Sequence, residues 1–105
     1  MGCEFVMDER LGIPLPHMDK DFEDYSEWEQ AEILLRWEEI RGMIPDRIKR
    51  LETMIIAKQD QLHVEENFAV SCRLNSEIAE LASTINELHL WFRVNQDIAV
   101  GAAHH

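Results

Sequence analysis

Residues 46–100 read DRIKR LETMIIAKQD QLHVEENFAV SCRLNSEIAE LASTINELHL WFRVNQDIAV, a stretch without a single glycine or proline. Glycine and proline are the strongest breakers of regular backbone, so their absence permits long helices. Apolar residues also recur through this stretch at the spacing of one helix face. The stretch therefore predicts an all-α protein dominated by long amphipathic helices.

The second half of this stretch carries an unbroken heptad pattern, with apolar positions spaced alternately by four and three residues. These positions are Leu74, Ile78, Leu81, Ile85, Leu88 and Phe92. The first half carries a second stripe, at Ile44, Ile48, Leu51, Ile55 and Leu62. The two stripes are out of phase, which favours a turn between them over one continuous rod with a stutter. We place the turn at residues 64–67, with Asn67 in a left-handed conformation, and expect a coiled-coil-like antiparallel hairpin.

Start and stop signals define a further helix before the hairpin. Ser26 and Glu29 have the spacing of a capping box, in which each side chain bonds the other's backbone amide. Gly42 is a natural residue after a helix end, and Pro45 is tolerated in a first helical turn. These signals predict three antiparallel helices forming one bundle over residues 26–98, at about 26–42, 46–64 and 68–98. The face of the first helix that carries Trp37 should pack on the hairpin.

The two ends of the chain lack helical signals. Residues 1–25 are rich in acids, and Pro14 and Pro16 disfavour helix, which predicts an extended acidic arm. Residues 99–105 resemble the remnant of an affinity tag, so the terminal histidines are left out of chemical argument. Met7 is an alternative natural start to Met1.

The net charge of −11 is concentrated in residues 1–43, which hold twelve acidic and four basic residues. Such a chain repels phosphate groups, which argues against nucleic-acid and anionic-membrane binding and favours a protein partner with a basic surface. No stretch is apolar enough to span a membrane. Two cysteines do not make a disulfide framework, so we expect a cytoplasmic protein.

Several large apolar side chains fall outside the predicted core stripes. They are Trp28, Leu35, Leu90, Trp91, Val94 and Ile98. Large exposed apolar patches mark interaction sites, and tryptophan is enriched among the residues that dominate binding energy. We therefore interpret these six residues as an interaction surface, most simply of a homodimer. Two alternatives stay open: cover by the arm or the first helix of the same chain, and a groove for a different protein.

Sequence motifs for catalysis are weak. There is no glycine-rich phosphate loop, and Cys72 has no neighbouring base in the sequence. Asp60 and His63 form one imperfect pair of the kind that carboxylate-bridged metal sites need twice. We expect no catalytic, metal-binding or cofactor-binding residues. The main hypothesis is a small non-catalytic cytosolic helical protein that acts through protein–protein interaction, as an adaptor or regulatory module.

Two alternative functions remain. The segment His63-Val64-Glu65-Glu66-Asn67 resembles the phosphoacceptor segment of histidine-kinase dimerisation hairpins, although Val64 stands where that family has an acid. The resemblance implies a phosphotransfer or phosphatase-like regulator that uses His63. The acids of residues 19–32 suggest instead a decoy for the basic site of a nucleic-acid-binding protein.

Overall fold

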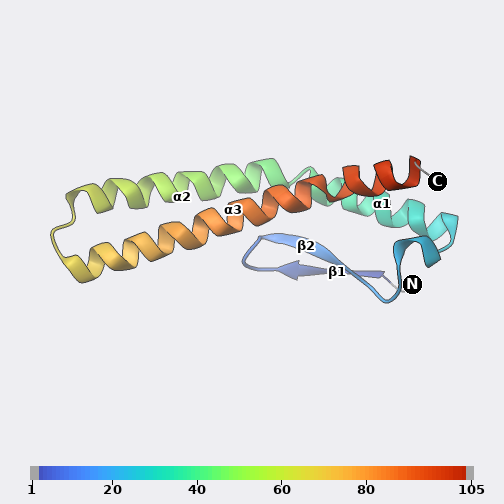
Figure 1. The fold of residues 1–105 in the computed structure, drawn as a ribbon, viewed down its shortest axis with the longest axis horizontal. Helices are drawn as coiled ribbons and strands as arrows, with labels where there is room; N and C mark the ends of the chain where they lie inside the picture. The colour runs from blue at the N-terminus through green and yellow to red at the C-terminus, as the bar shows by residue number, and fades with distance from the viewer. Residues whose placement is uncertain (1–2, 104–105) are drawn as a thin grey trace.

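The computed structural model describes the backbone of residues 3–103 and the side chains of residues 3–94. The chain folds into an elongated molecule of 59 × 24 × 18 Å (Figure 1). Its elements in chain order are β1 (Cys3–Asp8), β2 (Ile13–Met18), the short 3-10 helix η1 (Phe22–Asp24), α1 (Glu27–Arg41), α2 (Ile44–Val64) and α3 (Phe68–Ala103). The protein is thus mostly helical, with one small sheet.

The chain reverses between α2 and α3 inside the segment predicted to turn. Asn67 is not left-handed, however, since the only positive φ among the described residues belongs to a glycine. Its side-chain Oδ1 instead accepts a hydrogen bond from the amide of Val70 at 3.1 Å, which caps α3. Further along, the half-buried Lys58 of α2 pairs with Glu77 of α3, with 3.5 Å between Nζ and Oε1. This cation replaces an apolar residue in the α2 stripe.

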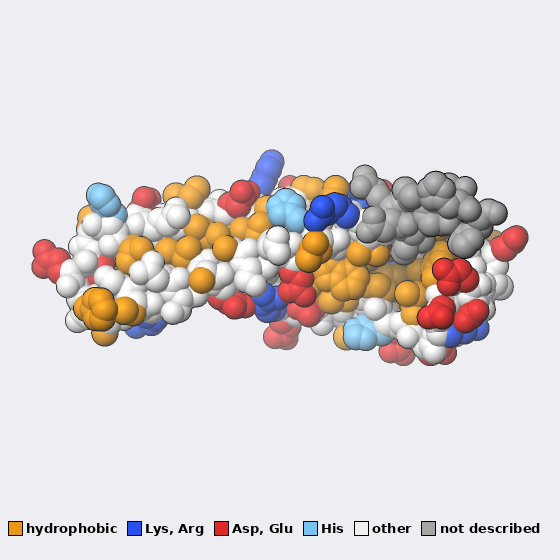
Figure 2. All heavy atoms as spheres, in the orientation of Figure 1, with side chains coloured by type: hydrophobic (Ala, Val, Ile, Leu, Met, Phe, Trp, Pro, Cys, Tyr) orange, Lys and Arg blue, Asp and Glu red, His pale blue; other side chains and the backbone are white. Residues whose placement is uncertain are grey.

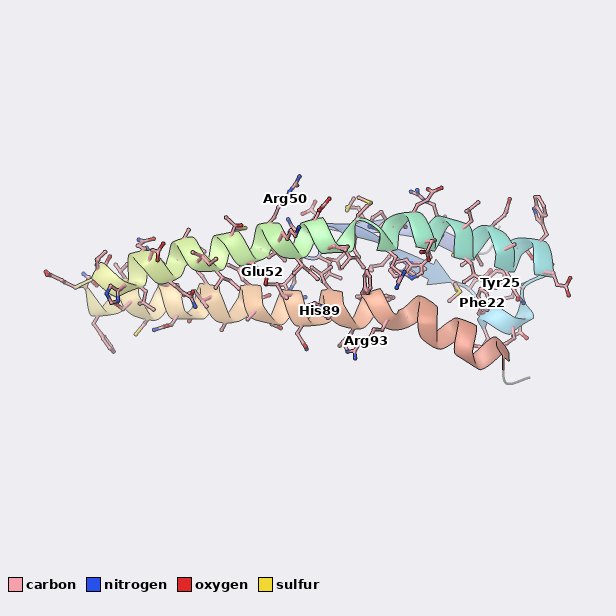
Figure 3. All side chains as sticks on the ribbon, turned by 90° about the horizontal axis from the view of Figure 1, so that it is seen from above. Phe22, Tyr25, Arg50, Glu52, His89 and Arg93 are labelled. Atoms are coloured by element: carbon pink, nitrogen blue, oxygen red, sulfur yellow. The ribbon has the colours of Figure 1, made fainter. Side chains whose placement is uncertain are left out.

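The direction of α1 corrects the expected three-helix arrangement. It does not fold back on α2; the two helices follow one another along the same side of α3 (Figure 3), and α3 crosses their path in the view of Figure 1. Gly42 and Met43 both have right-handed helical angles, so the junction bends the helical path only slightly. The 15 and 21 residues of α1 and α2 together match the 36 of α3. At about 1.5 Å per residue, α3 is about 54 Å long and spans both.

The all-α expectation is wrong for residues 3–18, which form an antiparallel hairpin rather than an extended arm. The paired residues of its ladder include Glu4↔His17, Phe5↔Pro16, Val6↔Leu15, Met7↔Pro14 and Asp8↔Ile13. Proline has no amide hydrogen, so Pro14 and Pro16 must lie where the backbone nitrogen faces away from β1. The ladder hydrogen bonds therefore join the alternate pairs, such as Val6 with Leu15.

Two arginines hold the hairpin loop on the helices. Arg47 of α2 donates from Nε to the carbonyl of Leu11 at 3.0 Å and from Nη2 to that of Arg10 at 3.3 Å. The Arg10 side chain reaches α3, where it pairs with Glu80 at 2.6 Å and with Glu87. The loop thus bridges α2 and α3 near the middle of the molecule.

The core lies where the hairpin, the α1–α2 junction and α3 meet. Its buried members are Leu11, Ile13, Trp37, Ile40, Ile44, Ile48, Leu51 and Leu88. The predicted inner face of α1 is therefore buried as expected. Toward the α2–α3 turn no third element covers the two helices, and the only buried apolar residue there is Leu74.

At the C-terminal end, the backbone of α3 continues to Ala103, past the predicted end at residue 98. Residues 99–103 therefore continue the helical backbone. The reason lies in composition, because a helix interior tolerates one glycine at a cost of about 1 kcal/mol and three of the other four residues are alanine, the best helix former.

The predicted capping box is present at the start of α1. The amide of Glu29 donates to the Ser26 hydroxyl at 3.2 Å, and the Ser26 amide donates to Glu29 Oε1 at 3.1 Å. Hydrogen bonds from the Ser26 backbone, and then from its side chain, lower the pKa of the Glu29 carboxyl. The ionised form is therefore favoured in the folded state.

This capping bond predicts a pH-dependent contribution to stability. A carboxyl whose pKa is lowered by folding stabilises the protein above its unfolded pKa, and the contribution is lost as the pH falls through the lowered value. We expect Glu29→Gln to be less stable than wild type at neutral pH, with the difference vanishing well below the ordinary value of 4.5. Urea unfolding at a series of pH values measures this; a difference that does not change with pH would contradict it.

Candidate protein-interaction site

The structure separates the six residues predicted to form an interaction surface. Trp28, Leu35 and Leu90 are 73%, 67% and 51% exposed. Trp91, in contrast, packs on the core, with its ring 5.7 Å from that of Trp37. Val94 is half-buried beside Trp91. The side chain of Ile98 lies outside the described residues.

The expected free surface at Trp91 and Val94 is therefore corrected: the chain itself contributes their neighbours. The small hollow around them is lined by residues of β2, η1 and α1, namely Pro16, Met18, Phe22, Ile33, Leu34 and Trp37. The physical reason is the direction of α1, which runs beside the C-terminal half of α3 and brings Trp37 over Trp91. A fold-back of α1 onto α2 would have left this part of α3 bare.

An apolar groove of about 390 Å³ lies between β1 and α1. Its apolar walls are Cys3, Phe5, Ile33 and Leu35, and its charged rim is Glu32, Arg36 and Glu39. Glu32, Arg36 and Glu39 of α1 recur at intervals of four and three residues, and Leu35 lies beside them on the same flank of that helix. The sequence alone identified Leu35; it missed Phe5, whose signal is the alternation of apolar Cys3, Phe5 and Met7 along a strand.

The strand beside this groove has an unused hydrogen-bonding edge. Because the ladder uses Glu4, Val6 and Asp8, the backbone amides of Phe5 and Met7 point away from β2. Within residues 3–103, no other backbone or side-chain group bonds these two amides. The Met7 residue at this edge is 56% exposed.

Negative charge prevails around the groove. The Arg36 guanidinium is 5.9 Å from the Phe5 ring centre and pairs with Glu39, with 3.3 Å between Nη1 and Oε2. Glu32 forms no ion pair within the part of the chain whose side chains are described, and Glu4 is exposed on β1. The one cation at the groove is thus neutralised, and an incoming cation meets free carboxylates.

Cys3 contributes an apolar wall to the groove. Burial raises the pKa of its thiol, the negative charge of Asp19 raises it further, and a hydrogen bond from the His17 backbone lowers it. The net direction is upward, which keeps the sulfur protonated at neutral pH. A protonated thiol is a poor nucleophile, and the Cys3 side chain serves the groove as an apolar wall.

The link between β2 and α1 fixes the two walls of the groove relative to each other. The buried Tyr25 donates its hydroxyl hydrogen to Asp19 Oδ1 at 2.8 Å and accepts the Asp19 amide at 3.1 Å. Gln30 of α1 donates to the Tyr25 carbonyl at 2.9 Å. Burial, and then the bond to Asp19, raise the pKa of the Tyr25 hydroxyl, so it remains a donor. Figure 3 shows Tyr25 and Phe22 together at the start of α1.

His63, the candidate residue for phosphotransfer, lies at the opposite end of the molecule from the groove. His63 is exposed in the last turn of α2, next to the turn into α3. No cluster of three or more histidine, cysteine or acidic side chains suited to a metal ion occurs among the described residues. Over the same residues, no helix combines the length and the apolar character that crossing a membrane requires.

Comparison of the chain with protein families, curated proteins and solved structures finds no match.

Proposed function

We propose that this is a small non-catalytic protein that acts through protein–protein contact, as an adaptor or regulatory module. The contact surface is the groove between β1 and α1 together with the exposed outer face of α1. The observation that carries the proposal is the exposure of Leu35 at the groove wall and of Trp28 one heptad before it. Two free cysteines agree with a reducing cytoplasm.

The arrangement of these two residues supports a binding role. Trp28 and Leu35 are seven residues apart, so they lie on the same side of α1, away from the core. A single exposed apolar residue needs no explanation, whereas a tryptophan and a leucine beside an apolar groove form a patch. Covering each side chain in a complex would contribute about 1.5–3 kcal/mol.

Site-specific photo-crosslinking tests this proposal in the cells that make the protein. The photoreactive amino acid p-benzoylphenylalanine is placed at Leu35, and at the exposed Gln61 of α2 as a control. We expect discrete protein adducts from Leu35, their loss when Trp28→Glu is added, and none from Gln61. Equal adduct yields from the two positions, or none from either, would contradict a contact surface on α1.

A homodimer is the second proposal, and a different surface favours it. Away from the core, α2 and α3 form a two-helix layer without a third element, with a shallow groove of about 300 Å³ between them. Its apolar lining is Ile55, Ile56, Ala82 and Ile85, and an apolar stripe follows the two helices on the face seen in Figure 2. Two such layers stacked face to face would form a four-helix core.

Sedimentation equilibrium tests the dimer. We expect a mass twice the 12.3 kDa of the chain at micromolar concentration. Ile56, which is 57% exposed, should be at the contact, so Ile56→Glu is expected to give a monomer while Gln61→Glu, on the opposite side of α2, leaves the dimer intact. A monomeric wild-type protein would exclude this arrangement.

A further inference from the structure

We propose that the groove binds an extended basic peptide segment, which pairs with β1 as a third strand of the sheet. The inference rests on the proposed function and specifies how the partner is recognised. Strand addition uses main-chain hydrogen bonds for affinity and pockets for alternate side chains for specificity. The outer edge of β1 offers both: unpaired main-chain groups and an apolar groove beside them.

The two edges of the sheet differ in their capacity to pair. On β2, the outward positions are Pro14 and Pro16, which offer no amide hydrogen to a neighbour. On β1, the outward positions are Phe5 and Met7, which offer both an amide and a carbonyl. The prolines thus close one edge and leave β1 as the only edge that a strand can join over its length.

The side chains beside β1 predict the pattern of the added strand. Successive side chains of a strand point to opposite faces. Every second residue of a peptide paired with β1 would lie on the side of Phe5, against Ile33 and Leu35 of α1. These residues should be apolar, and the residues between them lie on the opposite face of the sheet, which is the face of Glu4 and Asp8 on β1.

Charge selects a basic partner over a second copy of this chain. Glu4 is exposed on β1, and at the groove rim Glu32 forms no ion pair among the described side chains while Arg36 and Glu39 pair with each other. Two copies of β1 placed side by side would bring Glu4 and Asp8 of each strand close to the acids of the other, and like charges on neighbouring strands are destabilising. Lysine or arginine at the solvent-facing positions of a peptide gains attraction instead.

The test uses the synthetic peptide Lys-Val-Lys-Val-Lys-Val-Lys as probe, followed by NMR of backbone amides and by calorimetry. We expect saturable binding that shifts the amides of Phe5 and Met7. The same peptide with glutamate in place of lysine should bind at least about tenfold more weakly, because the groove is acidic.

One pair of variants separates the backbone edge from the side chain. Met7→Pro removes the outward amide without breaking the ladder, because Met7 faces Pro14 at a position that makes no ladder hydrogen bond. We expect it to weaken peptide binding at least about tenfold, as lost hydrogen bonds and a blocked edge predict. Met7→Ala keeps the amide and should bind as wild type. Equal binding by the two variants would overturn the proposal.

Modified peptides test the same edge in the unaltered protein, whether or not Met7→Pro folds. N-methylation of the residues whose amides face β1 should abolish binding, and N-methylation of the alternate residues should leave it intact. If the two N-methylated peptides both bind, or if neither binds, strand addition is wrong. If the wild-type protein forms a dimer without peptide and Met7→Pro dissociates that dimer into monomers, the β1 edge pairs with a second copy of the chain. That result would overturn the proposal of a basic peptide partner.

Failure of this inference is distinguishable from failure of the proposed function. If Met7→Pro retains the adducts formed from Leu35 in cells, and no probe peptide binds, α1 is a contact surface and strand addition is wrong. If wild-type protein forms no adducts from Leu35, the proposed function itself is wrong.

Discussion

Trp37→Ala is expected to lower the free energy of unfolding by about 3–5 kcal/mol, the usual cost of truncating a large buried aromatic side chain. Trp37 lies at the centre of the core, 3% exposed, and packs against Trp91 of α3. Its loss would leave a cavity at the point where α1, the hairpin and α3 meet. Urea unfolding followed by circular dichroism measures the change.

Trp37→Phe is the matched control for this cavity. The indole Nε1 of Trp37 is buried without a hydrogen-bond partner among the described residues. Phenylalanine retains most of the packing and removes this unpaired donor, which by itself costs about 1–3 kcal/mol when buried. We therefore expect Trp37→Phe to lose much less stability than Trp37→Ala. Equal losses would show that packing at this position does not hold α1 on α3.

Gly12→Ala is expected to destabilise the protein by about 2–5 kcal/mol, from a left-handed backbone costing about 1–2 and overpacking costing about 1–3. Gly12 has φ = 76°, and an added Cβ would lie 2.4 Å from Arg47 Nε. The arginine would have to move and release the carbonyls of Leu11 and Arg10. The hairpin would then lose its attachment to α2.

Gly42→Ala is the control, because Gly42 has right-handed helical angles and an added Cβ would meet the Glu39 carbonyl at an ordinary 3.4 Å. An alanine at such a position is neutral or stabilising by about 0.4–1 kcal/mol. Thermal or urea unfolding of both variants measures the difference. If Gly12→Ala were as stable as wild type, the loop geometry described above would be wrong.

Local signals in the sequence predicted the parts of the fold that local chemistry decides. The Ser26–Glu29 capping box and the phase change before Leu74 each depend on neighbouring residues, and both mark real element boundaries. The path through Gly42 could not be predicted in this way, because glycine accepts helical and left-handed angles alike. The path depends on contacts between residues distant in sequence, because α3 is as long as α1 and α2 together and packs against both.

The hairpin and half of the candidate site were missed for one reason. Pro14 and Pro16 disfavour both helix and a central strand, so the segment was interpreted as an extended arm. Both prolines are compatible with an edge strand if their nitrogens face away from the neighbouring strand. Whether they do so depends on the register with β1, which local sequence does not show. Once the arm is a hairpin, Phe5 becomes a groove wall. Exposure of Trp28 and Leu35 was predictable from helix periodicity, whereas the cover over Trp91 depends on where α1 lies.

β1 keeps one hydrogen-bonding edge free beside the groove, and residue-resolved hydrogen exchange of the free protein measures whether it does. We predict slow exchange at the amides of Val6 and Asp8, which pair with β2, fast exchange at Phe5 and Met7, and slowing at Phe5 and Met7 when the lysine–valine peptide is added. Equally slow exchange at all four amides in the free monomer would show that the edge is already occupied and that no strand can be added there.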